Sequence, residues 1–127
     1  MNKRRKAFIL ALGSNTAPEQ SLPMAKRQLE ALLGTLAFTP ILTTAAIGMD
    51  TAPFSNCLAY GRTDKQADEL IGLLKDVERL CGDHPQLRTR QHIVMDIDLL
   101  LLGRKRYHPD DWERDYIRQL MTQPTSQ

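Results

Sequence analysis

The sequence predicts one α+β domain over residues 1–127, with elements in the order β-α-β-β-α-β and a short helix at the end. A length of 127 residues is typical of a single compact domain. The hydrophobic share of 42% and the charged share of 25% are those of an ordinary globular protein. Short β-prone apolar runs alternate with two segments whose apolar residues recur at helical spacing. These observations exclude a disordered or fibrous chain.

The first half contains a strand, a helix and a second strand. Residues 7–12 are nearly all apolar, as in a strand covered on both faces, and the turn residues 13–15 end the run. Residues 18–33 have apolar side chains at helical spacing and begin with a proline. Residues 36–44 predict a second strand, which we expect to be an edge or irregular strand because it contains Pro40.

The second half repeats this order. Residues 54–63 predict a third strand, and a sequence typical of a capping box then leads into an apolar helical stripe over 67–81. The stretch 83–91 is polar and has no period. Residues 92–102 predict a fourth strand, whose apolar run is interrupted only by two aspartates. Pro109 begins the last predicted helix.

Two β-α-β halves of this kind predict the ferredoxin-like arrangement, a four-stranded antiparallel sheet with helices on one face and a short C-terminal helix. The other face and the rim of the sheet would then be free for a ligand. We expect residues 1–6 to form a basic tail and residues 122–127 to be frayed. Because one fold hosts many functions, the function must be inferred from site residues.

The net charge of +2 comes from the N-terminal end of the chain. Seventeen basic residues face fifteen acidic ones, and residues 3–6 contain four of the basic residues and no acid. The remainder is therefore slightly acidic, and the pI of 8.7 does not indicate a nucleic-acid-binding face. We expect no nucleic acid among the partners, and the sequence identifies no protein partner.

Cysteine usage and hydropathy bear on the cellular compartment. Cys57 and Cys81 are too few for a disulfide framework and lack metal-ligand spacing, so we expect small buried thiols in a reducing compartment. The apolar run 7–12 is shorter than the roughly seven to fifteen residues of a secretion signal. No segment approaches the ~20 apolar residues of a membrane span. The sequence therefore predicts a cytoplasmic protein that does not associate with membranes.

Asp96 and Asp98 are the strongest candidates for chemistry. Residues i and i+2 of a strand point to the same side, so the two carboxylates converge on one face. Two like charges this close in an apolar strand are costly without a positive partner. Mg²⁺ suits them, because it accepts one or two carboxylates and takes its other ligands from water and phosphate. The alternative is a pair of acids that faces solvent or nearby arginines.

Phe54 and Asn56 share one side of the third predicted strand. An aromatic ring beside an amide suits a planar heterocycle, because the ring stacks on the heterocycle and the amide can form hydrogen bonds with the heterocycle's edge. The alternative is a core phenylalanine and an asparagine that bonds to backbone at the strand end.

Other candidates give weaker signals. Arg88 and Arg90, in the polar stretch before the two aspartates, are suited to binding phosphate oxygens, and a solvated loop is the alternative. Residues 13–15 have the place of a phosphate-binding turn but neither the Walker lysine nor the dinucleotide glycine pattern. We interpret Trp112 and Tyr116 as helix packing.

Several motifs, taken in order along the chain, resemble one family. They are Ala11-Leu12-Gly13-Ser14-Asn15; Thr44 with Ile47-Gly48-Met49; Pro53-Phe54-Ser55-Asn56; Glu78 four residues before Gly82; and Asp96-Ile97-Asp98-Leu99-Leu100 followed by Leu102-Gly103. The series is similar to 6-hydroxymethyl-7,8-dihydropterin pyrophosphokinase, a kinase of folate biosynthesis. The resemblance covers residues 7–103.

The resemblance implies a ferredoxin-like fold, in agreement with the predicted element order. It also implies an enzyme that transfers the β,γ-diphosphate of ATP to the hydroxymethyl group of the pterin and releases AMP. Asp96 and Asp98 would then hold two Mg²⁺ ions that bridge the ATP phosphates. In this family positioning and charge neutralisation would supply most of the rate.

The resemblance also implies a pterin pocket. Phe54 would stack on the pterin, and Asn56 would read its amide edge. Thr44 and Ile47 would lie at the mouth of the same pocket.

The chain departs from the family pattern after the second predicted helix. There the family has arginines and a tryptophan-glycine-proline-arginine run, whereas this chain has Asp83, Pro85 and the run 90–93, Arg-Gln-His-Ile. Arg88 and Arg90 would replace the missing arginines from shifted positions.

We further expect the C-terminal segment of the family to be absent, so that Trp112 or Tyr107 closes the pterin sandwich. The alternative function is a non-catalytic pterin-binding module of the same family that has lost the ATP-gripping arginines.

Overall fold

The computed structural model describes residues 4–45 and 52–126. In this part of the chain the elements are β1 (Lys6–Ser14), α1 (Pro18–Leu33), β2 (Ala37–Phe38), β3 (Leu42–Thr44), β4 (Phe54–Thr63), α2 (Ala67–Leu80), α3 (Pro85–Thr89), β5 (Asp96–Leu102), β6 (Lys105–Arg106), α4 (Pro109–Trp112) and α5 (Asp115–Met121).

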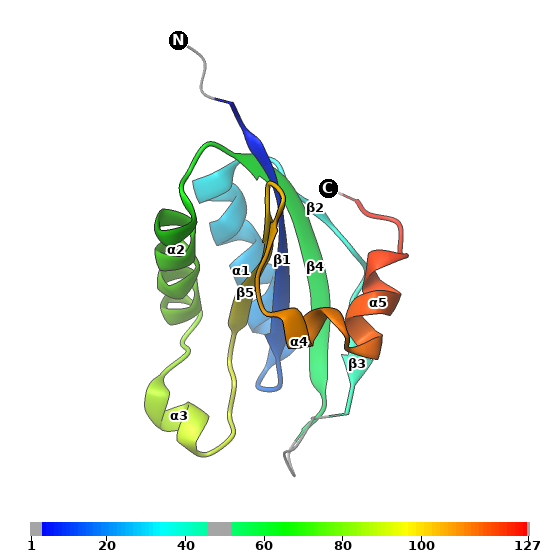
Figure 1. Ribbon diagram of the computed structural model, residues 1–127. Coiled ribbons are helices and arrows are strands. Elements are labelled where there is room, and N and C mark those ends of the chain that lie inside the picture. Colours follow the sequence, from blue (N-terminus) through cyan, green and yellow to red (C-terminus); the bar gives the residue numbers. More distant parts are fainter. Residues whose placement is uncertain (1–3, 46–51, 127) are drawn as a thin grey trace.

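All of these strands join one antiparallel sheet in the order β2-β4-β1-β5-β6, and β3 also pairs with β4. The apolar strand β1 lies in the middle and pairs with β4 on one side and β5 on the other. The helices α1 and α2 lie together on one side of the sheet (Figure 1). This is the predicted α+β, ferredoxin-like fold.

The sheet has six strands rather than the predicted four, for two local reasons. The segment predicted as one strand over 36–44 is divided at residues 39–41, which include Pro40, so that β2 and β3 pair separately with β4. At the other edge, Gly103 has a φ of 63°. This left-handed conformation, which glycine adopts without strain, turns the chain so that β6 returns along β5.

Both faces of the sheet carry buried apolar side chains, whereas we expected one face to be free. The main core lies between the sheet and α1 and α2. On the opposite face, Leu58 and Leu100 of the sheet pack with Ile117 and Leu120 of α5. The helices α4 and α5 therefore cover part of the face that we expected to be open (Figure 1). A ligand site on this face has to lie beyond the edge of α5.

Described residues near both ends of the chain are bonded to the sheet, which differs from the predicted tails. Lys6 already belongs to β1, and the Arg5 guanidinium donates to the carbonyl of Arg62 at 2.6 Å. At the other end, Ser126 exchanges two backbone hydrogen bonds with Phe38, at 2.7 and 2.9 Å. The C-terminal segment that we expected to be frayed is therefore attached to the edge of the sheet.

The helices also differ in detail from the prediction. The stretch 83–91 contains the short helix α3, and the last predicted helix is divided into α4 and α5. Cys57 is buried and Cys81 is partly buried, and both are free thiols. Among residues 4–45 and 52–126, no helix is both long and apolar enough to span a membrane.

Candidate functional site

A cavity of about 210 Å³ lies where β1 ends and β4 and β5 begin. Its floor is the sheet face that also carries α5, and residues of α4 and α5 form one wall. Five of the predicted site residues line this cavity: Thr44, Phe54, Asn56, Asp96 and Asp98. The structure thus places together side chains that are up to 54 positions apart in the sequence.

The register of the central strands explains why these side chains meet. Gly13 of β1 pairs with Asn56 of β4 on one side and with Asp96 of β5 on the other. Two residues earlier in β1, Ala11 pairs with Asp98. Because residues two apart in a strand share a face, the polar side chains of β4 and β5 flank a strip of small residues on β1. A Cβ at position 13 would lie 3.1 Å from the Asn56 Oδ1 atom, so the glycine keeps the floor open.

Asp96 and Asp98 project from one face of β5, as predicted, and Ile97 between them is buried in the main core. The Asp98 side chain is only 24% exposed. Its burial, and after that the neighbouring Asp96 carboxylate, raise the pKa of Asp98 to about 8. The His108 Nε2 atom lies 3.8 Å from Asp98 Oδ1, beyond hydrogen-bond distance. Without a cation beside it, burial and the neighbouring carboxylate therefore favour the protonated form of Asp98.

The amide of Asn56 has a defined orientation. Its Nδ2 group donates to Thr44 Oγ1 at 2.9 Å and lies 3.2 and 3.3 Å from the carbonyl oxygens of Leu42 and Phe54. These three acceptors point the NH₂ group toward β3 and the start of β4. The Oδ1 atom lies over Gly13 on the cavity floor, where none of the described residues donates a hydrogen bond to it.

Two aromatic rings line the cavity from different elements. Phe54 comes from the start of β4, and Tyr116 comes from α5. We interpreted Tyr116 as helix packing. It does pack against the second core cluster, formed by Leu58, Leu100, Ile117 and Leu120, but it also lines the cavity. Trp112 and Tyr107, which we expected to supply the second ring, are not among the cavity-lining residues. Ile47, predicted at the mouth of the pocket, lies outside the described residues.

Trp112 and Tyr107 have other partners. The Trp112 indole N–H donates to the carbonyls of Tyr107 at 3.0 Å and Leu100 at 3.2 Å. The Arg106 guanidinium stacks over the Trp112 ring at 4.1 Å, and the Lys105 ammonium lies 5.0 Å from the Tyr107 ring. These contacts attach α4 to the β5–β6 hairpin, so both rings have a structural role.

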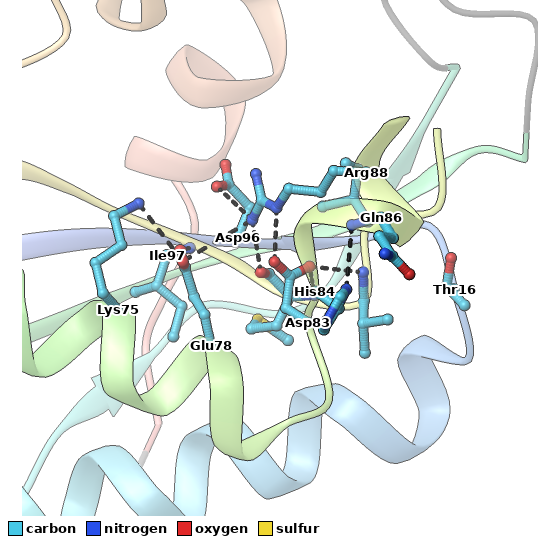
Figure 2. A network of polar contacts seen from close by, with 12 residues as sticks. Thr16, Lys75, Glu78, Asp83, His84, Gln86, Arg88, Asp96 and Ile97 are labelled. Atoms are coloured by element: carbon cyan, nitrogen blue, oxygen red, sulfur yellow. Dashed lines mark hydrogen bonds and ion pairs between the residues drawn. The ribbon is translucent and has the colours of Figure 1, made fainter. Parts of the chain in front are cut away.

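Arg88 contacts acids rather than an open cavity (Figure 2). Its Nε atom donates to Asp83 Oδ2 at 2.6 Å, and one terminal nitrogen donates to Asp96 Oδ1 at 3.2 Å. The same nitrogen donates to the Met95 carbonyl at 3.0 Å and lies 3.9 Å from Glu78 Oε1. The guanidinium thus stands behind the acid pair, between β5 and the C-terminal end of α2.

The acids around Arg88 also hold the start of β5. Asp83 Oδ1 accepts the backbone N–H groups of Val94 at 3.2 Å and Met95 at 3.3 Å. The Glu78 side chain, only 6% exposed, accepts the N–H of Ile97 at 2.7 Å through Oε2. Arg90, in contrast, is exposed, follows α3 and does not line the cavity. Of the two predicted phosphate-binding arginines, only Arg88 is therefore close to the acid pair.

Sequence reasoning missed three polar or aromatic cavity residues between the start of α4 and the first turn of α5. Tyr116, Asp111 and Arg114 line the wall opposite the strands, and Arg114 Nε donates to Asp111 Oδ1 at 3.1 Å. The spacing of Asp111 and Arg114, three residues apart, was a local signal for this ion pair. Nothing local indicated that these helices fold back over the start of β5.

The acid pair fits a hard divalent cation better than a transition metal. In the part of the chain that the structure describes, no three His, Cys, Asp or Glu side chains cluster as metal ligands. A closed protein cage of the zinc type is therefore not formed there. Mg²⁺ needs only one or two carboxylates, because water and phosphate complete its coordination. A divalent cation beside Asp98 would favour the ionised carboxylate that burial and Asp96 disfavour.

Comparison with protein families identifies the chain. The family model for 7,8-dihydro-6-hydroxymethylpterin-pyrophosphokinase (HPPK) matches residues 9–124, which is most of the chain. The chain therefore belongs to this family. The match extends beyond residue 103, where we expected the resemblance to end, and includes α4 and α5. No curated protein matches the chain.

Proposed function

We propose that this protein transfers the β,γ-diphosphate of ATP to the hydroxymethyl group of 6-hydroxymethyl-7,8-dihydropterin, with Mg²⁺, and releases AMP. This reaction belongs to folate biosynthesis, and we place it in the cytoplasm, which suits the free thiols. One observation carries the proposal. A single cavity is lined both by the acid pair and by an aromatic-amide set suited to a flat heterocycle.

The part of the cavity beside the start of β4 is suited to the pterin. We infer that the ring lies between Phe54 and Tyr116, because both rings line the cavity and aromatic stacking favours a planar bicycle. The Asn56 Oδ1 atom would accept a hydrogen bond from an N–H group on the pterin edge, since its NH₂ group is already bonded within the protein. Thr44 holds that amide in place, and Ile47 stays a prediction for the mouth of the pocket.

The spacing of the strands relates the pterin to the acid pair. Neighbouring strands lie about 4.8 Å apart, so Asn56 and Asp96, separated by β1, have backbones on the order of 10 Å apart. A bicyclic ring whose edge is held at Asn56 would therefore extend its 6-substituent toward β5. The hydroxyl group that receives the diphosphate would then lie beside Asp96 and Asp98.

The proposed chemistry depends on position and charge. The pterin hydroxyl oxygen forms a bond to the β-phosphorus of ATP, the bond from that phosphorus to the oxygen shared with the α-phosphorus breaks, AMP leaves and the hydroxyl proton passes to solvent. When bound, Mg²⁺ would neutralise phosphate charge and make the β-phosphorus easier to attack. Asp96 and Asp98 would be its protein ligands, and the family resemblance implies two such ions. The cavity walls would fix the hydroxyl oxygen near the phosphorus.

A second candidate function is a pterin-binding module without turnover. The structure gives one reason to consider it, namely that Arg88 is bonded to Asp83 and Asp96 and that Arg90 does not line the cavity. An enzyme that binds a triphosphate would gain from free guanidinium groups, at about 1.5–3 kcal/mol for each charge-assisted hydrogen bond.

One assay separates the two candidates. The purified protein is mixed with ATP, Mg²⁺ and 6-hydroxymethyl-7,8-dihydropterin, and AMP is measured with and without the pterin. The enzyme proposal expects AMP that requires both Mg²⁺ and the pterin and that is lost in Asp98→Asn. Pterin binding without AMP, seen as quenching of intrinsic fluorescence, would support the module instead. The absence of pterin binding would contradict both candidates.

A further inference from the structure

The acids around the start of β5 outnumber the basic side chains beside them. Among the described residues, Glu78, Asp83, Asp96 and Asp98 lie in this cluster, and Lys75 and Arg88 are the permanently charged basic side chains within 4 Å of them. Lys75 lies 3.5 Å from Glu78 on the side of α2. With all four acids ionised, a state that a bound cation would favour, two negative charges remain, which one divalent cation would neutralise.

Arg88 is a built-in part of this cluster rather than a mobile clamp. Its partner Asp83 has a side chain only 8% exposed, and Glu78 beside it is 6% exposed. If the guanidinium left, these buried carboxylates would lose their main counter-charge, which is unfavourable for buried acids. The three contacts from Nε and one terminal nitrogen fix the planar group in one orientation.

The position of Arg88 determines how much of the acid pair is open to a cation. One terminal nitrogen of Arg88 donates a hydrogen bond to Asp96 Oδ1 at 3.2 Å, and Arg88 itself does not line the cavity. A cation in the cavity then meets Asp98 and the remaining oxygen of Asp96. Two divalent ions at this site would lie next to a fixed positive charge as well as next to each other.

We propose that Arg88 is a resident counter-charge of Asp96, so that the nucleotide-free protein binds one divalent cation at the acid pair and binds it more weakly because of Arg88. This inference rests on the proposed function only in taking the acid pair as the Mg²⁺ site. A second ion would then bind only together with the nucleotide. Asp83 holds Arg88 in this position, because its Oδ2 atom accepts the hydrogen bond from Arg88 Nε at 2.6 Å.

The test is a Mn²⁺ titration of the whole chain without nucleotide, followed by electron paramagnetic resonance of the free ion. The wild type should bind one Mn²⁺ at the acid pair. Arg88→Met removes the charge and retains the length of the side chain, so Mn²⁺ should bind about tenfold or more tightly and a second ion should be taken up. Arg90→Met is the matched control, because Arg90 is exposed and does not line the cavity, and its Mn²⁺ affinity should stay at the wild-type value.

The possible results separate the role of Arg88 from the metal role of the acid pair. Two Mn²⁺ ions bound by the wild type, or an unchanged or lower affinity in folded Arg88→Met, would overturn the inference and leave the proposed function intact. No Mn²⁺ binding by any variant would instead contradict the metal role of the acid pair. Circular dichroism checks that the variants fold. If Arg88→Met does not, Arg88→Gln, which keeps an N–H donor for Asp83, carries the same expectation.

Discussion

The two halves of the cavity differ in the charge of the side chains that form them. On the side proposed for the pterin, Asn56 and Thr44 are neutral and bonded to each other, and Phe54 and Tyr116 are aromatic. On the side proposed for the phosphates, buried or half-buried acids surround the Arg88 guanidinium. A flat ring can be recognised by side chains that the fold itself positions, whereas a polyphosphate needs cations. Because Arg88 is already paired with Asp83 and Asp96, we propose that metal cations from solution supply this charge.

The largest expected effect is on the phosphate side. Asp98→Asn removes one of the two carboxylates proposed to hold Mg²⁺, so AMP formation should fall by roughly a thousandfold or more. Pterin affinity should change by less than about threefold, because Asn56 and Phe54 are untouched. Steady-state AMP release and fluorescence quenching measure the two quantities separately. A similar loss of both would mean that the halves do not act independently.

On the pterin side, Asn56→Ala should have the next largest effect. The variant loses the acceptor proposed for the pterin edge and leaves Thr44 without its 2.9 Å amide partner. Pterin affinity should fall roughly ten- to a hundredfold, at about 1–3 kcal/mol for an unsatisfied buried polar group. Mn²⁺ affinity should be unchanged, and this serves as the check that the variant folds. A lower Mn²⁺ affinity with unchanged pterin affinity would reverse the assignment of the two halves.

The two halves were also not equally predictable from the sequence. Asp96 and Asp98, and likewise Phe54 and Asn56, are two residues apart in strands, so local alternation already placed each pair on one face. That the two pairs meet depends on the β1 register, in which Gly13 lies between Asn56 and Asp96. The sequence alone supported this pairing only through the family resemblance.

The partners of Arg88 and the second aromatic ring were not predictable by local rules. Arg88 is bonded to Asp96 from α3, a short helix in a stretch with no hydrophobic period. The expected ring was Trp112 or Tyr107, but Tyr116 lines the cavity because α5 folds back across the sheet. Both outcomes depend on long-range packing, which short-range patterns do not encode.

A substitution in each candidate ring tests that correction. Tyr116→Leu keeps an apolar side chain against the second core cluster and removes the ring, so pterin affinity should fall by roughly two- to tenfold, at ~0.5–1.5 kcal/mol for an aromatic pair. Trp112→Phe should leave pterin affinity at the wild-type value, since Trp112 is not in the cavity lining. Fluorescence titration of both variants gives the comparison. A loss confined to Trp112→Phe would restore the original expectation.

The smallest expected effect is a pH dependence of stability. Because the pKa of Asp98 is raised to about 8 in the folded protein, the folded state keeps a proton that the unfolded state has lost at intermediate pH. The metal-free wild type should therefore lose stability as pH rises from about 4 to 8. Asp98→Asn lacks this loss, so its melting temperature should exceed that of the wild type by a few degrees (~2–6 °C) at pH 8.5 and by less at pH 5.

Two controls accompany this measurement. Mg²⁺ added at pH 8.5 should raise the melting temperature of the wild type and leave that of Asp98→Asn nearly unchanged. Asp110→Asn, at an exposed acid in the first turn of α4, should show no pH-dependent gain over the wild type. A gain in Asp110→Asn equal to that in Asp98→Asn would mean that the effect comes from net charge and not from the acid pair.

The claim on which the account depends is that the cation at the acid pair lies beside the pterin. Paramagnetic broadening by Mn²⁺ tests it directly, because the effect falls steeply with distance from the ion. In a complex with 6-hydroxymethylpterin, the methylene protons of the 6-substituent should broaden strongly on addition of Mn²⁺ and sharpen again in Asp98→Asn. Methylene signals that stay sharp while both Mn²⁺ and the pterin are bound would contradict the account.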